Sequence, residues 1–203
     1  TKTATMAPKG PQFYRNSSRD SDMKFNDLRD FITFLERKGE LRRVKTPVSC
    51  ELEIAEIADR VVKRGGPALL FEDVAGYDMP VLINMYGTEQ RMAWALGVEK
   101  LEDLVDRVQG LLQLMHGPPE GLMNKLRTLG QLVHLGSFQP KTVRQAPCQA
   151  VVLQGDEVDL LKFPTLKCWP EDGGHFITLP LVITRDPETG TQNYGTYRLQ
   201  VYD

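Results

Sequence analysis

The sequence has few cysteines and no long apolar run. These two features argue against a disulfide-rich secreted protein and against a membrane-spanning one. Its three cysteines, Cys50, Cys148 and Cys168, are widely spaced, odd in number and contain no C-x-x-C pair. This pattern argues against the disulfide framework of a secreted protein. No run of eighteen apolar residues occurs, and the first residues lack the apolar segment of a signal peptide. We therefore expect a cytoplasmic protein with no membrane-spanning segment.

An excess of charge of one sign is also absent. The 25 basic and 27 acidic residues are interspersed and give a formal net charge of -2 at pH 7. Nucleic-acid binding uses a positive stripe along the phosphate backbone, so no nucleic-acid partner is expected. With 41% hydrophobic and 26% charged residues among 203, the composition is that of an ordinary globular protein of one large or two small domains.

The first 22 residues differ from the rest of the chain. They are rich in Thr, Ser, Lys, Pro and Asp and have no apolar period, so we expect a disordered tail over residues 1–22. Met23 directly precedes the first helical pattern and is a candidate natural initiator. Asn26 is placed to cap that helix and Gly39 to end it.

Residues 23–115 have the pattern of a small α/β domain. Their apolar residues alternate as in strands or recur at helical spacing, and turn residues separate the segments. Strands are predicted over residues 40–48, 68–74 and 79–86, and helices over 26–38, 52–62 and 88–115. The Gly65-Gly66-Pro67 run lacks the spacing of a phosphate-binding loop, so it is interpreted as the end of a helix.

A second region begins after a connector. The Gly- and Pro-rich segment "HGPPEG" at residues 116–121 ends the preceding helix and begins a predicted helical connector over residues 116–145. Residues 146–203 have the sequence pattern of an antiparallel β domain, with short apolar segments separated by turn residues. Short strands are predicted over residues 150–155 and 159–164, and longer ones over 175–185 and 194–202, on either side of a turn at residues 186–190.

Several polar residues are candidates for chemistry. His116 and His134 stand alone, and no cysteine has a visible base or a metal-spaced companion, so a structural role is favoured for each. The segment "WPEDGGHF", residues 169–176, is richer. Its Asp172 and His175 could form an acid–base pair or bind a metal, although turns often have this composition.

The segment "NYGTYR" at residues 193–198 is unusual for a strand. Alternation places Asn193, Gly195 and Tyr197 on one face and Tyr194, Thr196 and Arg198 on the other. Glycine weakens a strand unless something approaches its backbone closely. A flat ligand against Gly195 fits this pattern, with the Asn193 amide for a hard cation and Arg198 for an anion. An edge hairpin with solvated polar residues is the alternative.

Taken over its length, the sequence resembles the UbiD-like family of prenylated-FMN-dependent decarboxylases. The resemblance runs from about Met23 to Asp203 and rests on long segments in family order. These are "FNDLRDFITFLERKGELRRV", "EIAEIADRVVKRGGPALLFEDVAGYDMPVLINMYGT", "APCQ", "CWPEDGGHFITLPLVITRDPETG" and "NYGTYRLQVYD". It implies an α+β fold, with a small N-terminal α/β domain followed by the first strands of a split β-barrel that binds the flavin.

The resemblance also assigns roles to the N-x-G-x-Y-R motif. Asn193 is expected to ligate a divalent metal, Mn²⁺ or Mg²⁺, at the flavin phosphate, with K⁺ as a further ion. All of Asn193, Gly195, Thr196, Tyr197 and Arg198 are expected to bind prenylated FMN, with Thr196 and Tyr197 lining it largely through the backbone. Arg198 is expected to hold the substrate carboxylate and to act in catalysis. No family role is implied for Glu171, Asp172 or His175.

The implied reaction is the non-oxidative decarboxylation of an aromatic or α,β-unsaturated acid, with a polyprenyl-hydroxybenzoate of quinone biosynthesis as one candidate. A flavin prenyltransferase would supply the cofactor. Such an enzyme would be peripheral to the membrane if its substrate is polyprenylated, and a homo-oligomer at full length. Family members are more than twice as long, so we expect this chain to be an N-terminal fragment that is inactive alone.

Two other functions remain open at this stage. A non-catalytic flavin- or partner-binding module could keep the N-terminal domain and the N-x-G-x-Y-R strand without a complete catalytic site. A split-barrel flavin reductase would instead reduce FMN with a nicotinamide cofactor. A downstream His and Glu for the metal, with an acidic catalytic pair, would favour the decarboxylase.

Overall fold

The computed structural model describes residues 23–115 and 142–202. The predicted tail over residues 1–22, most of the predicted connector over residues 116–145, and both His116 and His134 lie outside the described residues. The described part is mixed α+β with small sheets, which confirms the fold class at that level. The split barrel stays a prediction.

Two compact units divide the described chain. The first contains residues 25–92 and 154–202, and the second contains residues 23–24, 93–115 and 142–153. All seven strands of the described chain and the N-x-G-x-Y-R motif belong to the first unit.

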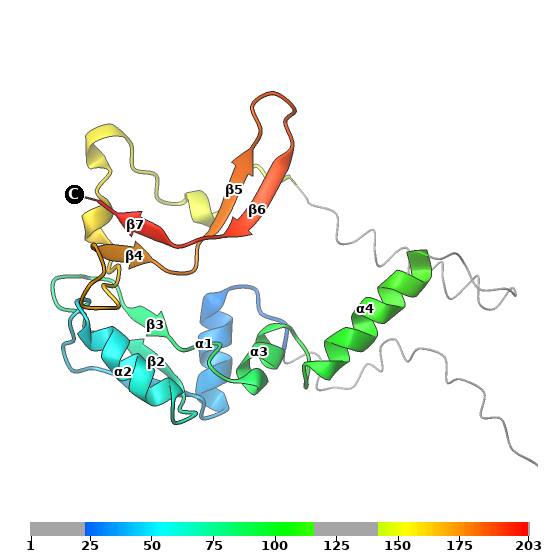
Figure 1. Cartoon of the computed structure of the whole chain (residues 1–203), viewed down its shortest axis with the longest axis horizontal. Coiled ribbons are helices and arrows are strands. Elements are labelled where there is room, and N and C mark those ends of the chain that lie inside the picture. The colour runs from blue at the N-terminus through cyan, green and yellow to red at the C-terminus, as the bar shows by residue number, and fades with distance from the viewer. Residues whose placement is uncertain (1–22, 116–141, 203) are drawn as a thin grey trace, which may run out of the picture. The chain divides into compact units, whose positions relative to one another are not determined.

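The N-terminal elements follow the predicted order. They are α1 (Leu28–Arg37), β1 (Leu41–Val44), α2 (Glu53–Val62), β2 (Ala68–Phe71), β3 (Val81–Ile83), α3 (Glu89–Ala95) and α4 (Glu102–Met115). β1 pairs in parallel with β2 across the α2 crossover, and β2 pairs antiparallel with β3. Figure 1 shows α1 and α2 beside this sheet. Among the residues described, no helix is long and apolar enough to span a membrane.

The start of α1 corrects one prediction. Asp27, not Asn26, is the N-cap, because its carboxylate accepts the backbone N–H groups of Arg29 and Asp30. Asn26 instead donates its side-chain amide to Asp30 (2.8 Å). Gly39 has φ +74° just after the helix, so its predicted role at the helix end is confirmed.

One apolar core joins residues from both ends of the first unit. Its buried members are Val48, Cys50, Ile54, Leu69, Phe71, Val74 and Leu166. The Lys167 N–H donates to the Cys50 carbonyl (3.1 Å), and the Leu52 N–H donates to the Lys167 carbonyl (3.0 Å). This short parallel bridge holds the segment that carries Leu166 against the start of α2.

The two short strands predicted over residues 150–155 and 159–164 are wrong. Residues 155–157 and 160–162 form 3₁₀ helices, and a further one covers Pro147–Gln149. The physical reason is local: Gln154 and Glu157 form a capping box, and the Asp159 carboxylate accepts the Leu161 N–H (2.9 Å). Such side-chain bonds to the backbone compete with strand pairing.

The two longer strands predicted in this region are each divided. Residues 175–185 form β4 (His175–Ile177) and β5 (Leu181–Arg185), separated at Pro180, which has no N–H to donate. Residues 192–201 form β6 (Gln192–Thr196) and β7 (Leu199–Val201). β5 pairs with β6 around the predicted turn, whereas β4 pairs with β7, so two small antiparallel sheets result (Figure 1).

Candidate functional site

The β5–β6 hairpin sets the faces of the N-x-G-x-Y-R motif. Its register pairs Asn193 with Thr184 and Gly195 with Val182. Tyr194 and Thr196 pair with Ile183 and Leu181 on the opposite face of the hairpin. The alternation predicted within residues 193–196 is therefore confirmed.

Gly195 allows a close contact inside the motif. A Cβ at this position would lie 2.5 Å from Cε2 of the Tyr197 ring, so a larger residue would require the ring to shift. The ring of Tyr197 thus lies against the backbone at Gly195. Tyr197 itself is 51% exposed, so the motif presents an aromatic ring at the surface.

Arg198 lies where the strand is interrupted, between β6 and β7. Its Nη2 donates to Oδ2 of Asp172 (2.8 Å), and its guanidinium carbon lies 3.6 Å from the centroid of the Phe176 ring. A planar cation at this distance from an aromatic face makes a cation–π contact. The Arg198 side chain is 43% exposed, whereas that of Asp172 is only 15% exposed.

The ion pair changes the pKa of both groups. The hydrogen bond with Asp172 is the main cause of a raised pKa for Arg198. For Asp172, partial burial disfavours the charged form, but the bonds from Arg198 and from the Trp169 N–H outweigh it and lower the pKa. Both groups are therefore charged at neutral pH.

Asp172 and His175 make separate contacts, which leaves their predicted acid–base pairing without support. Nδ1 of His175 lies 2.6 Å from the Thr165 carbonyl oxygen. Because a carbonyl only accepts, Nδ1 carries the proton in this bond. His175 thus links β4 to Thr165 by a hydrogen bond, while Asp172 is bonded to Arg198.

The described residues do not form a metal site by themselves. Over residues 23–115 and 142–202, no three His, Cys, Asp or Glu side chains gather in a way that could hold a metal ion. Asn193 is exposed on β6 and offers one amide oxygen. A hard divalent cation needs six or more oxygen ligands, so these residues supply at most part of such a site.

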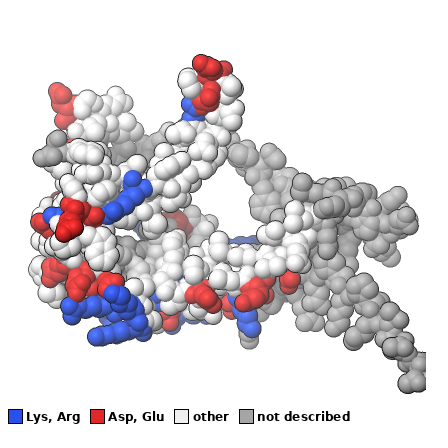
Figure 2. All heavy atoms as spheres, viewed as in Figure 1, with Lys and Arg blue, Asp and Glu red and all other residues white. Residues whose placement is uncertain are grey.

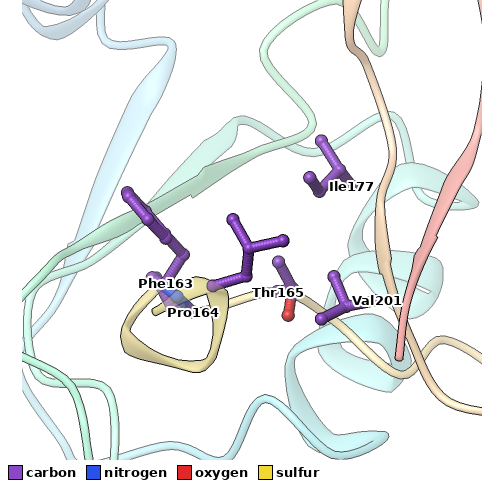
Figure 3. Close-up of a pocket in the computed structure, with 6 residues that line it drawn as sticks. Phe163, Pro164, Thr165, Ile177 and Val201 are labelled. Atoms are coloured by element: carbon purple, nitrogen blue, oxygen red, sulfur yellow. The ribbon is translucent and has the colours of Figure 1, made fainter. Parts of the chain in front are cut away.

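The described residues form two pockets that the N-x-G-x-Y-R motif does not line. A pocket of about 200 Å³ is lined by Leu160, Phe163, Pro164, Thr165, Ile177 and Val201, and its walls are almost wholly apolar (Figure 3). A larger hollow of about 650 Å³ lies between α2 and residues 168–170. The smaller is below the size of usual ligand pockets, and the motif lines neither.

Acidic and basic groups are mixed on the surface in view. Figure 2 shows red and blue atoms beside one another around the N-terminal elements, whereas the β5–β6 hairpin has red and blue atoms at its tip and is otherwise largely uncharged. Its exposed apolar side chains include Leu181, Ile183 and Tyr194.

Sequence reasoning missed the partners of Arg198. Asp172 was considered only with His175, and Phe176 was not considered for the site. Charge complementarity alone could not select Asp172 among 27 acidic residues, because the contact joins positions 26 residues apart. The pairing of β4 with β7, which brings Phe176 beside Arg198, was not predicted either.

Two family models match the chain. The model for the 3-octaprenyl-4-hydroxybenzoate carboxy-lyase N-terminal domain matches residues 32–108. The model for the Rift-related domain of the same carboxy-lyase matches residues 141–203, which contain Asp172 and the N-x-G-x-Y-R motif.

Known proteins are similar over most of this chain. An uncharacterised protein of Archaeoglobus fulgidus is 53% identical over 181 residues, which are 89% of this chain and 36% of that protein. The vanillic acid decarboxylase of Sedimentibacter hydroxybenzoicus, in closed form, is 30% identical with a TM-score of 0.67, over 89% of this chain and 36% of that one.

A third similar protein was solved with a modified flavin. The UbiD-class enzyme HmfF of Pelotomaculum thermopropionicum, an evolved dimeric form in complex with prFMN, is 28% identical with a TM-score of 0.62, over 85% of this chain and 35% of that one. The present chain therefore spans about a third of the length of each of these proteins.

Proposed function

Because the chain belongs to the UbiD-like family, of which it carries the N-terminal portion, we propose that the protein containing it decarboxylates an aromatic or α,β-unsaturated acid without oxidation. In this reaction an acid R–COOH becomes R–H and CO2. The observation that carries the proposal is the exposed Arg198 at the end of the intact N-x-G-x-Y-R motif, held beside Phe176.

Arg198 is proposed to bind the substrate carboxylate. A guanidinium presents several N–H donors in one plane, and Asp172 is bonded to Nη2 alone. The exposed part of the side chain can therefore receive a second carboxylate. Holding the carboxylate in a fixed direction also fixes the orientation of the carbon–carbon bond that breaks when CO2 leaves.

Prenylated FMN is proposed as the cofactor, supported by the flavin complexes of the similar HmfF structures. The motif fits a flat cofactor in its chemistry, since the exposed Asn193 amide lies on the same face of β6 as Gly195, against which the Tyr197 ring lies. When bound, prenylated FMN would supply an electron sink for the electron pair that CO2 leaves behind. The described residues do not complete a site for Mn²⁺, Mg²⁺ or K⁺, so no step is assigned to a metal.

The test uses the full reading frame that contains this chain, expressed with a flavin prenyltransferase. Visible absorption of the purified protein reports bound flavin, and CO2 release is measured with a panel of aromatic acids. Flavin binding together with CO2 release is the expected result. Flavin binding without CO2 release would favour a binding module, and nicotinamide-dependent FMN reduction would favour a reductase.

Replacement of Arg198 gives the first specific prediction. Arg198→Ala should lower kcat/KM for the acid on the order of 10²–10³-fold, because the charged donor facing the carboxylate is lost. Arg185→Ala is the matched control, since Arg185 is an exposed arginine on β5 of the same hairpin. Near-normal turnover in Arg198→Ala, with flavin still bound, contradicts the role given to Arg198.

A further inference from the structure

We infer that Asp172 and Phe176 are positioning residues that hold the Arg198 guanidinium in one orientation before an acid binds. The inference rests on the proposed function. The family resemblance gives neither residue a role, and the sequence offered Asp172 only as a partner of His175. It is carried by the 2.8 Å bond from Nη2 to Asp172 and by the 3.6 Å approach of the guanidinium to the Phe176 ring.

Asp172 is itself fixed by the backbone. Its Oδ2 accepts the Trp169 N–H (3.1 Å), and its own N–H donates to the Trp169 carbonyl (3.1 Å). The carboxylate thus closes the turn of residues 169–172 and is 15% exposed. The bond from Trp169 and the partial burial restrict the movement of this carboxylate, so it can serve as an anchor for Arg198.

Phe176 fixes the plane of the same guanidinium. It lies on β4, and the β4–β7 pairing sets it opposite Gln200, two residues beyond Arg198. The strand pairing therefore determines where the ring lies. With Asp172 bonded to one nitrogen and the ring over one face, the side chain is ordered before any ligand arrives.

This ordering has a functional consequence. A free arginine loses much rotamer freedom when it binds a carboxylate, and a pre-ordered one loses less. The alternative is that Asp172 competes with the substrate for Arg198. The backbone bond that Asp172 receives from Trp169 favours positioning, because a competitor has to withdraw when the substrate binds.

The two interpretations predict opposite effects of Asp172→Asn, measured in the flavin-loaded, full-length protein. Positioning predicts that kcat/KM falls on the order of 10²-fold, as expected when a reacting group is displaced by about 1 Å. Competition predicts that kcat/KM rises. Asp172→Glu should recover part of the loss, because it keeps the charge, and Phe176→Leu should show a milder loss. Glu171→Gln, at the exposed neighbouring carboxylate, should stay within about twofold of wild type.

A second readout does not depend on catalysis. The deprotonated guanidine attacks the carbonyl carbons of phenylglyoxal, so an arginine whose charged form is stabilised by a carboxylate reacts slowly. In Asp172→Asn the labelling rate of Arg198, followed by peptide mass spectrometry, should rise while that of Arg185 stays constant. Arg185 is exposed on β5 and reports any general unfolding within the same molecule.

The outcomes separate the inference from the proposed function. If wild type decarboxylates but Asp172→Asn shows unchanged or higher kcat/KM, positioning is wrong and the function stands. An unchanged labelling rate of Arg198 also overturns the inference. If wild type binds flavin and releases no CO2, the proposed function fails, and the labelling of Arg198 alone decides whether Asp172 holds it.

Discussion

Arg91 and Arg198 are the same residue type in opposite environments. Arg91 is fully buried, and its guanidinium donates to Glu40 (2.6 Å) and to the carbonyls of Gly66 and Asn84. These bonds tie α3 to the turns that flank the first sheet, which is a structural task. Arg198 is exposed and keeps a side open to solvent. Environment, not residue type, distinguishes the structural arginine from the one proposed to bind the substrate.

Asp27 shows at the residue scale how one carboxylate sets the start of a helix. Asp27→Ala should lower the free energy of unfolding by about 1 kcal/mol, because two N–H groups of the first turn lose their acceptor. Asn26→Ala should cost less, since its exposed bond to Asp30 is readily replaced by water. Urea unfolding followed by circular dichroism measures both. A larger effect for Asn26→Ala would restore the original assignment of the cap.

At the scale of elements, the β5–β6 hairpin depends on its turn. Oδ1 of Asp186 accepts the N–H groups of Glu188 (2.8 Å) and Thr189 (2.7 Å). Gly190 closes the turn with φ +71°, a backbone region that suits glycine. The turn was predicted from the places of its Pro and Gly, because such chemistry is local.

The same turn should make the hairpin sensitive to acid. The hydrogen bonds from Thr189 and Glu188 hold the pKa of Asp186 below its ordinary value of 3.8. An acid with a depressed folded-state pKa stabilises above its unfolded pKa, and the contribution is lost as pH falls through the folded value. The hairpin amide signals in NMR should therefore broaden or shift as pH falls below about 3.8.

Two variants check the origin of this acid sensitivity. Asp186→Asn keeps an oxygen acceptor but has no titrating charge, so its hairpin should respond little to acid. Glu188→Gln, in the same turn, should behave as wild type does. Equal acid responses in wild type and Asp186→Asn would show that another group is responsible.

At the scale of the whole molecule, Leu166 joins distant parts of the chain in one core. It is 7% exposed and belongs to the cluster of Val48, Ile54 and Phe71. Leu166→Ala should lower the free energy of unfolding by about 2–5 kcal/mol, because a cavity replaces buried methyl groups. Leu160→Ala, at a leucine that is 51% exposed, should cost about 0.5 kcal/mol or less. Thermal unfolding of both variants tests the difference.

Periodicity and turn chemistry predicted the elements wherever the signals are local. The helices predicted over residues 26–38 and 52–62 and the first three strands are confirmed, with shorter bounds for the strands. The single helix predicted over residues 88–115 is wrong: it is divided into α3 and α4, and Gly97 lies between them with φ +69°. β2 is buried throughout, as its unbroken apolar run suggests. The failures are equally specific. Residues 150–164 have strand-like composition, yet the caps at Gln154 and Asp159 favour 3₁₀ helices.

The amino-acid sequence alone determined the α+β class, the order of the elements and the segments that place the chain in its family, since each depends on residues close together in the chain. Tertiary structure alone decided which carboxylate meets Arg198. That contact joins residues 26 positions apart, with the guanidinium over a ring on β4, the strand that pairs with β7. Local patterns specify strands but not their partners, because pairing depends on non-local packing.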